Sequence, residues 1–221
     1  MRTWLITGCS TGLGKSLADA ALRHGDNVVL TARHPDTLHA LAARHPDTAL
    51  ALPLDVTDTG QIADAVAAAE ARFGAIDVLV NNAGYGYRAA VEEADDADVQ
   101  ALFATNFFGT VSMIKAVLPG MRARRSGTII NFSSIAGRKA IAGSGYYAAS
   151  KFAVAGLSDA LMQEVAPLGI RVMVVEPGAF RTDFAGRSLT QSATAIADYA
   201  ATAGIRRKEN DRSHGKQPGD P

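Results

Sequence analysis

Thr3-Trp-Leu-Ile-Thr7 is followed at once by Gly8-Cys-Ser-Thr-Gly12-Leu-Gly14, and helical periodicity then runs through residues 15–23. A strand, a glycine turn and a helix in this order are the context of a dinucleotide-binding fingerprint. The alternative interpretation is that these glycines belong to an ordinary loop without a ligand. The flanking strand and helix favour nucleotide binding instead. The predicted nucleotide-binding residues here are Gly8, Ser10, Thr11, Gly12, Leu13 and Gly14.

The three glycines of this turn each allow what a larger residue would block. Gly8 lets the chain turn tightly, Gly12 lets the backbone approach a pyrophosphate, and Gly14 lets the helix pack closely on the strand. The amino terminus of the helix would then present free N–H groups and a partial positive charge to the phosphates.

Strand and helix patterns alternate along the chain. Apolar strands are predicted at residues 3–7, 27–32, 49–53, 77–81, 128–133 and 170–176, and helices at 15–23, 35–44, 58–73, 96–124 and 145–166. We therefore expect an α/β fold with a doubly wound parallel sheet in three αβα layers, the Rossmann arrangement. Ligands bind over the carboxyl ends of such strands. The residues that follow these ends include Gly8, Arg33, Asp55, Asn81, Ser134 and Pro177.

Tyr147 and Lys151 stand four residues apart in a predicted helix, so the phenol and the ammonium share one face. A cation beside a phenol favours the phenolate and lowers the pKa of the phenol from its ordinary value of ~10. The pair is a candidate for proton transfer near neutral pH. Most pairs at this spacing are solvated surface or packing contacts, so the interpretation depends on the other motifs.

Together the motifs resemble the short-chain dehydrogenase/reductase family over residues 3–183. They are Thr7-Gly-x-x-x-Gly-x-Gly14, Asn81-Asn-Ala-Gly84, Asn106 in the long helix, Ser134, and Tyr147-x-x-x-Lys151, in the order of the family. Ser134 precedes Tyr147 by thirteen residues, which is the usual interval of the family. The resemblance implies the Rossmann fold and an oxidoreductase activity.

The resemblance also implies catalytic roles. Tyr147 would be the general acid in carbonyl reduction and the base in alcohol oxidation, while Lys151 would hold the nicotinamide ribose and lower the pKa of Tyr147. Ser134 would hydrogen-bond the substrate oxygen, with Ser133 as the alternative serine. Asn106 would hold a water that links Lys151 to solvent, and it could equally be a polar residue that kinks its helix against the sheet.

Further residues are implied to bind the rest of the cofactor, in three groups along its length. They are Asp55 and Val56 beside the adenine; Asn82, Ala83 and Gly84 along the adenosine ribose; and Pro177, Gly178 and Thr182 over the nicotinamide, where Tyr147 and Lys151 also contribute.

Cofactor preference depends on the end of the second strand. Members that prefer NAD carry an acidic residue there, which binds the ribose 2′-hydroxyl. This chain has Thr31-Ala-Arg33 and no carboxylate until Asp36. Arg33 could pair with a 2′-phosphate and stack on the adenine, or be a surface arginine at a helix start. We favour NADP(H) over NAD(H).

The segments Tyr85-Gly-Tyr87 and Gly178-Ala-Phe-Arg-Thr-Asp183 resemble the branch with 17β-hydroxysteroid and retinol dehydrogenase-like members. That branch implies an apolar or medium-sized ketone or secondary alcohol as the substrate. Candidate pocket residues are Tyr87, Ile141 and Phe184.

The chain departs from the family pattern near its carboxyl terminus. We expect a nucleotide-binding and catalytic domain at residues 1–185 and a truncated substrate-lid segment with a polar tail at 186–221. Residues 193–201 are a candidate helix, and the chain from Ile205 onward offers little to bury and is predicted as loop or disorder. The last helix and the seventh strand of the family are expected to be missing, because the sequence is a fragment or the protein is short. A homodimer and a homotetramer both stay open.

The amino-acid composition limits the kinds of binding partner that we expect. The 22 basic and 22 acidic residues balance, which argues against a nucleic-acid or anionic-membrane surface. The single cysteine excludes an intrachain disulfide, and the five histidines show no zinc spacing, so no metal site is expected. No signal peptide fits and no uncharged apolar run reaches the length of a membrane span. We expect a cytoplasmic protein that acts on a small carbonyl or alcohol.

Three functional hypotheses follow. An NADP(H)-dependent oxidoreductase is the first, and a non-catalytic NAD(P)-binding sensor of the same fold is the alternative. Ser134, Tyr147 and Lys151 argue against the sensor. A nucleotide-sugar epimerase or dehydratase would share Tyr-x-x-x-Lys, but those proteins have another glycine spacing and a larger carboxyl-terminal domain.

Overall fold

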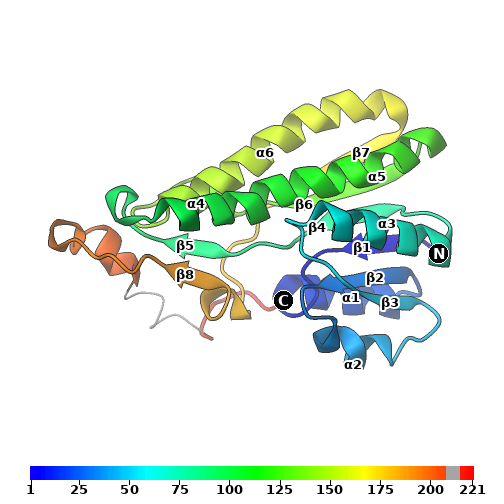
Figure 1. Cartoon of the computed structure of the whole chain (residues 1–221), viewed down its shortest axis with the longest axis horizontal. Coiled ribbons are helices and arrows are strands. Elements are labelled where there is room, and N and C mark those ends of the chain that lie inside the picture. The colour runs from blue at the N-terminus through cyan, green and yellow to red at the C-terminus, as the bar shows by residue number, and fades with distance from the viewer. Residues whose placement is uncertain (208–214) are drawn as a thin grey trace.

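A six-stranded parallel sheet forms the middle layer of the molecule, in a computed structural model that describes residues 1–207 and 215–221 (Figure 1). The strand order is β3-β2-β1-β4-β6-β7, so the order reverses between β1 and β4. The predicted doubly wound fold is confirmed. The strands are β1 (Thr3–Ile6), β2 (Asn27–Ala32), β3 (Ala49–Pro53), β4 (Val78–Asn81), β6 (Gly127–Phe132) and β7 (Ile170–Val175).

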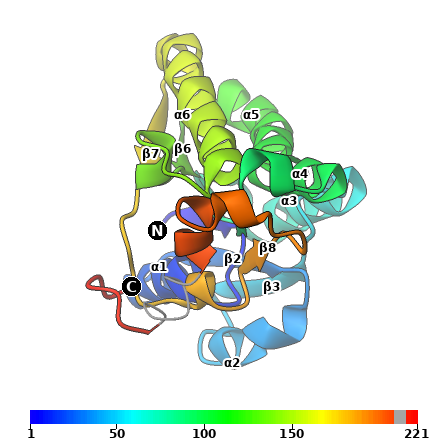
Figure 2. The ribbon, with the colours of Figure 1, turned by 90° about the vertical axis from the view of Figure 1, so that its left-hand side faces the viewer.

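Helices cover both faces of the sheet (Figures 1 and 2). On one face α1 (Gly12–Arg23) and α2 (His39–Ala42) pack over a core that includes Ile6. On the other face the core includes Leu5 and is covered by the remaining long helices. Neighbouring residues of β1 thus point into opposite cores, as the period of a strand requires. The helices of the second face are α3 (Thr59–Phe73), α5 (Thr110–Arg124) and α6 (Gly145–Val165).

The helix predicted at residues 96–124 is interrupted. It consists of α4 (Asp96–Phe103), a π-helical turn (Ala104–Gly109) and α5. A π turn is a frequent device at functional sites, because it redirects side chains within a helix. Here it contains Asn106, whose side chain binds the loop after β4.

The same helical run, Asp96–Arg124, is long and apolar enough to cross a membrane by length and composition alone. It is not an uncharged run, because it contains Asp98 and Lys115. In this structure the buried residues Met113, Val117 and Met121 of α5 pack into the core over the sheet. Core helices of globular proteins meet the same length criterion, so this run is weak support for a membrane segment.

A second, two-stranded parallel sheet joins β5 (Gly86–Arg88) to β8 (Leu189–Gln191), and neither strand was predicted. It holds the segment after residue 186 against the end of the molecule near α4 and the start of α6 (Figure 1). The candidate helix at 193–201 is wrong except for one 3₁₀ turn, Ala197–Tyr199.

The chain from Ile205 onward was predicted as loop or disorder. This prediction is wrong for residues 205–207. Residues 203–207 are helical, Ala203 is buried, and Arg207 forms an ion pair with Glu93. Residues 208–214 lie outside the described part of the chain. Residues 215–221 contain no helix, but Gly219 N donates to Ala179 O at 3.0 Å.

The predicted helix at 35–44 is shorter in the structure, where a 3₁₀ turn (Pro35–Leu38) precedes the four-residue α2. Only Leu38 and Leu41 of this segment are buried in the core. An apolar face of two residues does not support a longer helix.

Candidate active site

The glycine turn after β1 adopts backbone conformations that favour glycine. Gly8 and Gly12 have φ angles of 72° and 58°, in the left-handed region. A Cβ on Gly14 would lie 2.3 Å from Asn82 Nδ2 and 2.5 Å from Gly8 O, so no side chain fits there. The predicted close packing at Gly14 is thus present, against Asn82 and the turn itself.

Thr7 and Asn82 hold this turn on the adjacent strand end. Thr7 Oγ1 accepts hydrogen bonds from Asn82 N and Ala83 N, both at 3.0 Å. Asn82 Nδ2 donates to Thr7 O at 2.9 Å and to Gly8 O at 3.1 Å. The Asn82 amide therefore braces β1 against β4 at the switch point. The role of the Thr7 hydroxyl was not predicted, although Thr7 opens the motif.

The amino terminus of α1 fits a pyrophosphate. Thr11 is the N-cap residue, yet its side chain makes no capping hydrogen bond, so the first N–H groups of α1 have no side-chain cap. A helix terminus of this kind, beside glycines that let a ligand approach, binds phosphate groups. Thr182 lies next to it, since a Cβ on Gly12 would be 3.3 Å from Thr182 Cβ. Ser10 and Leu13 belong to the same turn and first helical turn.

Tyr147 and Lys151 lie on the first turns of α6 and are buried, with exposed fractions of 8% and 5%. Lys151 Nζ lies 6.0 Å from the centre of the Tyr147 ring and donates to Phe132 O at 2.9 Å. Ser134 follows β6 and is also buried. The structure thus brings the three predicted catalytic residues to one edge of the sheet.

The two neighbouring serines have different partners. Ser133 Oγ donates to Lys151 O at 2.9 Å and so fastens α6 to the end of β6. Ser134 Oγ accepts from Ala136 N at 3.1 Å. The Ser134 hydroxyl hydrogen is not used in that bond, which suits the substrate-facing role predicted for Ser134.

Burial raises the pKa of Tyr147, while the Ser134 hydroxyl and the Arg88 guanidinium act in the opposite direction. The expectation of a pKa below the ordinary value does not hold for this structure, because loss of solvation outweighs the nearby groups. Burial also lowers the pKa of Lys151 to about 8. Lys151 therefore loses its charge at a lower pH than an exposed lysine, so it stabilises a phenolate less above about pH 8.

Asn106 connects the π turn to the residues around Lys151. Its Oδ1 accepts from Tyr85 N at 3.0 Å, and its Nδ2 donates to Tyr85 O at 2.9 Å and to Ser150 Oγ at 3.1 Å. A Cβ on Gly84 would lie 3.0 Å from Asn106 Oδ1 and 3.5 Å from Lys151 Nζ. Asn106, Gly84 and Lys151 therefore meet. The side-chain amide of Asn106 fastens the loop after β4 to the π turn.

The predicted cofactor residues after β2 and β3 differ in exposure and in hydrogen-bond partners. Arg33 is exposed directly after β2, and Asp36 is exposed on the next turn. Asp55 Oδ1 accepts from Thr57 N at 2.9 Å and from Thr57 Oγ1 at 2.7 Å. Val56 is buried, and a Cβ on Gly109 would lie 2.6 Å from its side chain, so Val56 packs against the π turn.

On the substrate side, only one of the three candidate pocket residues touches the site. The ring centres of Phe184 and Tyr147 are 5.7 Å apart. Tyr87 is fully buried and its hydroxyl donates to Asp98 Oδ2 at 3.1 Å, so it packs towards α4. Ile141 is partly exposed on the loop before α6. Arg88, which acts on the Tyr147 phenol, was not predicted.

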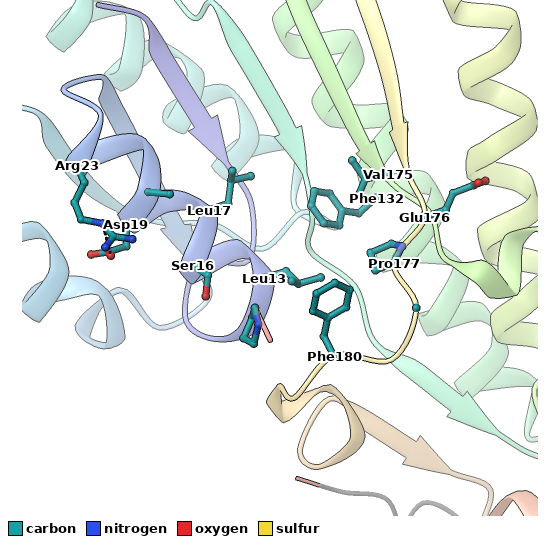
Figure 3. A pocket seen from close by; sticks show the side chains of 13 residues that line it. Leu13, Ser16, Leu17, Asp19, Arg23, Phe132, Val175, Glu176, Pro177 and Phe180 are labelled. Carbon is teal, nitrogen blue, oxygen red and sulfur yellow. Dashed lines mark ion pairs between the residues drawn. The ribbon is translucent and has the colours of Figure 1, made fainter. Parts of the chain in front are cut away.

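A cavity of about 720 Å³ opens on the α1 side of the sheet (Figure 3). Leu13 and Leu17 of α1 form one wall, and Phe132 and Pro177 at the ends of β6 and β7 form the opposite wall. Leu13, Pro177 and Gly178 are predicted cofactor residues, but Ser134, Tyr147 and Lys151 do not line this cavity. The cavity adjoins the catalytic group, because the carbonyl oxygen of its lining residue Phe132 accepts a hydrogen bond from Lys151 Nζ.

A parallel sheet with a glycine turn at its switch point, and a buried Ser-Tyr-Lys group at the same edge, define a nucleotide-dependent oxidoreductase of the Rossmann class. A family model described as short chain dehydrogenase matches residues 2–193. The chain belongs to the short-chain dehydrogenase family, and the predicted resemblance is confirmed.

Curated relatives match most of the chain. Oxidoreductase BOA17 of Botryotinia fuckeliana is 43% identical over 98% of this chain and 79% of its own length. The 3-ketodihydrosphingosine reductase of Bacteroides thetaiotaomicron is 43% identical over 89% and 71%, respectively. Retinol dehydrogenase 8 of Homo sapiens is 40% identical over 91% and 65%. The retinol dehydrogenase-like branch is thereby supported.

Solved structures agree with the family. A short-chain dehydrogenase from Streptomyces avermitilis has a TM-score of 0.92 at 43% identity, covering 100% of this chain and 79% of that chain. A metagenomic short-chain oxidoreductase in complex with NADP has a TM-score of 0.76 at 33% identity, covering 80% and 82%.

Proposed function

We propose that this protein reduces a carbonyl, or oxidises the corresponding secondary alcohol, with NADP(H) as the cofactor and Tyr147 as the proton donor or acceptor. The observation that carries the proposal is the burial of Tyr147 beside Ser134 and Lys151, at the edge of the sheet that also carries the glycine turn.

The cofactor would be held by the chain in three places. The glycine turn and the amino terminus of α1 would bind the pyrophosphate, and Arg33 would pair with the 2′-phosphate. Thr182 and Pro177 would lie over the nicotinamide. When bound, the nicotinamide supplies or accepts the hydride. A solved relative in complex with NADP supports the preference for NADP(H) over NAD(H).

The protein residues would handle the substrate oxygen and its proton. In reduction, Ser134 Oγ donates a hydrogen bond to the carbonyl oxygen and polarises it. Tyr147 transfers its hydroxyl proton to that oxygen as the carbon becomes reduced, and leaves a phenolate. Lys151 and Arg88 stabilise the phenolate until solvent returns the proton. Alcohol oxidation runs through the same groups in reverse.

The substrate class follows from the walls near Tyr147. Phe184 packs against the Tyr147 ring, and the relatives include a retinol dehydrogenase and a ketosphingoid reductase. We infer an apolar or medium-sized ketone, aldehyde or secondary alcohol.

A panel of ketones, aldehydes, steroids and retinoids, followed by nicotinamide absorbance with both cofactors, tests the proposal. We expect turnover on at least one apolar member and a higher kcat/KM with NADPH than with NADH. Tight NADPH binding with no turnover on any member would instead favour the non-catalytic sensor.

A further inference from the structure

The short strand β5 links the carboxyl-terminal segment to the helix that carries Tyr147. On one side, Ser192 N donates to Arg88 O at 3.0 Å, next to the pairing of β5 with β8. On the other side, Ala89 N donates to Gly143 O at 3.2 Å, and Ala89 forms an isolated bridge with Ser144. The strand is therefore fixed between β8 and the start of α6.

Side chains alternate across β5 and set the direction of Arg88. Tyr87 points towards α4, where its hydroxyl binds Asp98. Gly86 faces the other way, since a Cβ there would lie 3.1 Å from the Phe184 ring. Because alternate residues of a strand share a face, Arg88 lies on the Gly86 side. That is the side of Phe184, whose ring packs against Tyr147.

The Arg88 guanidinium meets α6 at its first turn. Arg88 Nη1 donates a hydrogen bond to Ser144 Oγ, and Ser144 is the buried N-cap residue of α6. Ser144 O accepts from Ala148 N at 2.8 Å, which closes the first turn around Tyr147. Arg88 is thus linked through the Ser144 side chain to the first turn of α6, which contains Tyr147.

We propose that Arg88 is a positioning residue for proton transfer: it fixes the first turn of α6 through Ser144, and its positive charge stabilises the Tyr147 phenolate. The inference rests on the proposed function of Tyr147. It assigns an electrostatic role at the site to Arg88, which none of the sequence motifs includes.

Two groups from other elements lower the pKa of the Tyr147 phenol, and Lys151 Nζ lies 6.0 Å from the centre of its ring. Ser134 follows β6, Lys151 lies one turn along α6, and Arg88 comes from β5. Burial raises the pKa of Tyr147, and Ser134 and then Arg88 lower it. Burial lowers the pKa of Lys151 to about 8, so Lys151 loses its proton before a phenol of raised pKa does. Arg88 keeps its charge throughout this range.

The test measures the titration of Tyr147 directly, as the ultraviolet difference between each protein and its Tyr147→Phe counterpart, without cofactor. In Arg88→Gln and in Arg88→Met we expect the phenol to titrate higher by about one pH unit. Arg88→Lys keeps the charge and should titrate close to the parent. Ser144→Ala removes the contact to α6 but keeps the charge, so its titration should stay while kcat falls.

Enzyme activity gives a second readout. For carbonyl reduction, which needs the protonated phenol, the alkaline limb of the kcat/KM profile should move up in both neutral variants. An unmoved titration and an unmoved limb in folded Arg88→Gln or Arg88→Met, with changes in KM or Tm alone, would overturn the inference. Turnover retained in Tyr147→Phe would instead overturn the proposed function, and the titration does not depend on turnover.

Discussion

Lys151 is a charged group kept at a cost to stability. Its side chain is buried, its ammonium donates to a backbone carbonyl of β6, and burial lowers its pKa to about 8. Removal of an ammonium from water opposes folding unless the charge is fully paired. A residue of this kind at the edge of the sheet indicates selection for chemistry over stability, which is common at active sites.

Lys151→Met should therefore change how stability depends on pH. Between about pH 8 and 10 the unfolded parent binds more protons than the folded parent at this residue, so its free energy of unfolding rises with pH. Lys151→Met lacks that rise and should be more stable near neutral pH, with turnover lost. Urea unfolding across this range measures it. Lys115→Met, on an exposed part of α5, is the control, and an identical rise in Lys151→Met would refute the assignment.

Arg33 carries the proposed cofactor preference. Arg33→Asp removes a guanidinium from a 2′-phosphate and adds a carboxylate that can bind a ribose 2′-hydroxyl. We expect the NADPH-to-NADH ratio of kcat/KM to fall by about 10- to 100-fold, the value of a charge-assisted hydrogen bond. Steady-state kinetics with both cofactors measures the ratio. Arg122→Asp makes the same charge change at an exposed position of α5. An NADPH-to-NADH ratio in Arg33→Asp equal to the ratio in Arg122→Asp would sink the assignment.

At the scale of elements, two glycines on helices give opposite predictions. Gly14 lies where α1 packs against Asn82. A Cβ on Gly14 would lie 2.3 Å from Asn82 Nδ2. Gly14→Ala should displace the glycine turn, lower Tm and weaken cofactor binding at least tenfold. Gly156 is exposed on α6, and no described atom outside its own helical backbone lies within 4 Å of the position of its Cβ. Gly156→Ala should stabilise the protein by about 0.5–1 kcal/mol.

Thermal melts and calorimetric titration with NADPH measure both glycine variants. Comparison of Gly14→Ala with Gly156→Ala shows whether a loss of Tm comes from a steric clash at Gly14 or from replacing any helical glycine. A Gly14→Ala protein with parental Tm and parental cofactor affinity would show that the turn adapts easily, and it would contradict the packing argument.

Elements of the main sheet could be predicted from the sequence because they are long and continuously apolar. The six strands and the helix with Tyr147 and Lys151 begin and end within one residue of the expected bounds. Strands β5 and β8 have three residues each, too few for a period-2 pattern to be visible. The sequence offered Asn106 as a residue that kinks its helix, but the bond of its side chain to Tyr85 joins segments that are distant in sequence and was not predicted.

The same reason explains what was missed in the site. Ser134, Tyr147 and Lys151 were found through fixed spacing within one chain segment. Arg88 lowers the pKa of Tyr147 although the two residues are 59 positions apart in the sequence. Only the fold brings them together. The direction of the Tyr147 pKa also depends on burial, which the spacing of a Tyr/Lys pair does not report.

At the scale of the whole molecule, a buried carboxylate adds to the β5–β8 pairing in holding the segment 186–207. The Glu93 side chain is 2% exposed, and Arg207 Nη2 donates to Glu93 Oε2 at 2.8 Å. Glu93 also accepts from Ala90 N and Ile196 N, both at 2.9 Å. One side chain thus holds together the loop after β5, the segment beyond β8 and the helical turn that contains Arg207.

Arg207→Met should loosen that segment. Loss of a charged hydrogen-bond partner costs about 1–3 kcal/mol, and each kcal/mol lowers Tm by about 2–4 °C at this chain length. We expect a lower Tm and faster proteolysis after residue 186, with the main sheet intact. An unchanged Tm and an unchanged cleavage pattern would show that the segment is held by other contacts.

The pH dependence of the same group follows from its hydrogen bonds. The bonds from Ala90 N and Ile196 N, and then Arg207, lower the pKa of Glu93. A lowered pKa stabilises the fold above the unfolded value of about 4.3, and this contribution is lost as pH falls through the folded value. Glu93→Gln should lose stability less steeply in acid than the parent. Glu164→Gln, exposed on α6, is the control and should follow the parent.

Tyr147→Phe tests the proposed mechanism most directly, because it removes one hydroxyl and leaves the ring against Phe184. The measurement pairs calorimetric NADPH binding with turnover of the best substrate from the panel. We predict a Kd within about threefold of the parent and a fall in kcat of about 10²- to 10⁴-fold, the range of general acid catalysis. Turnover within about tenfold of the parent, in a variant that binds NADPH normally, would contradict Tyr147 as the proton-transfer residue.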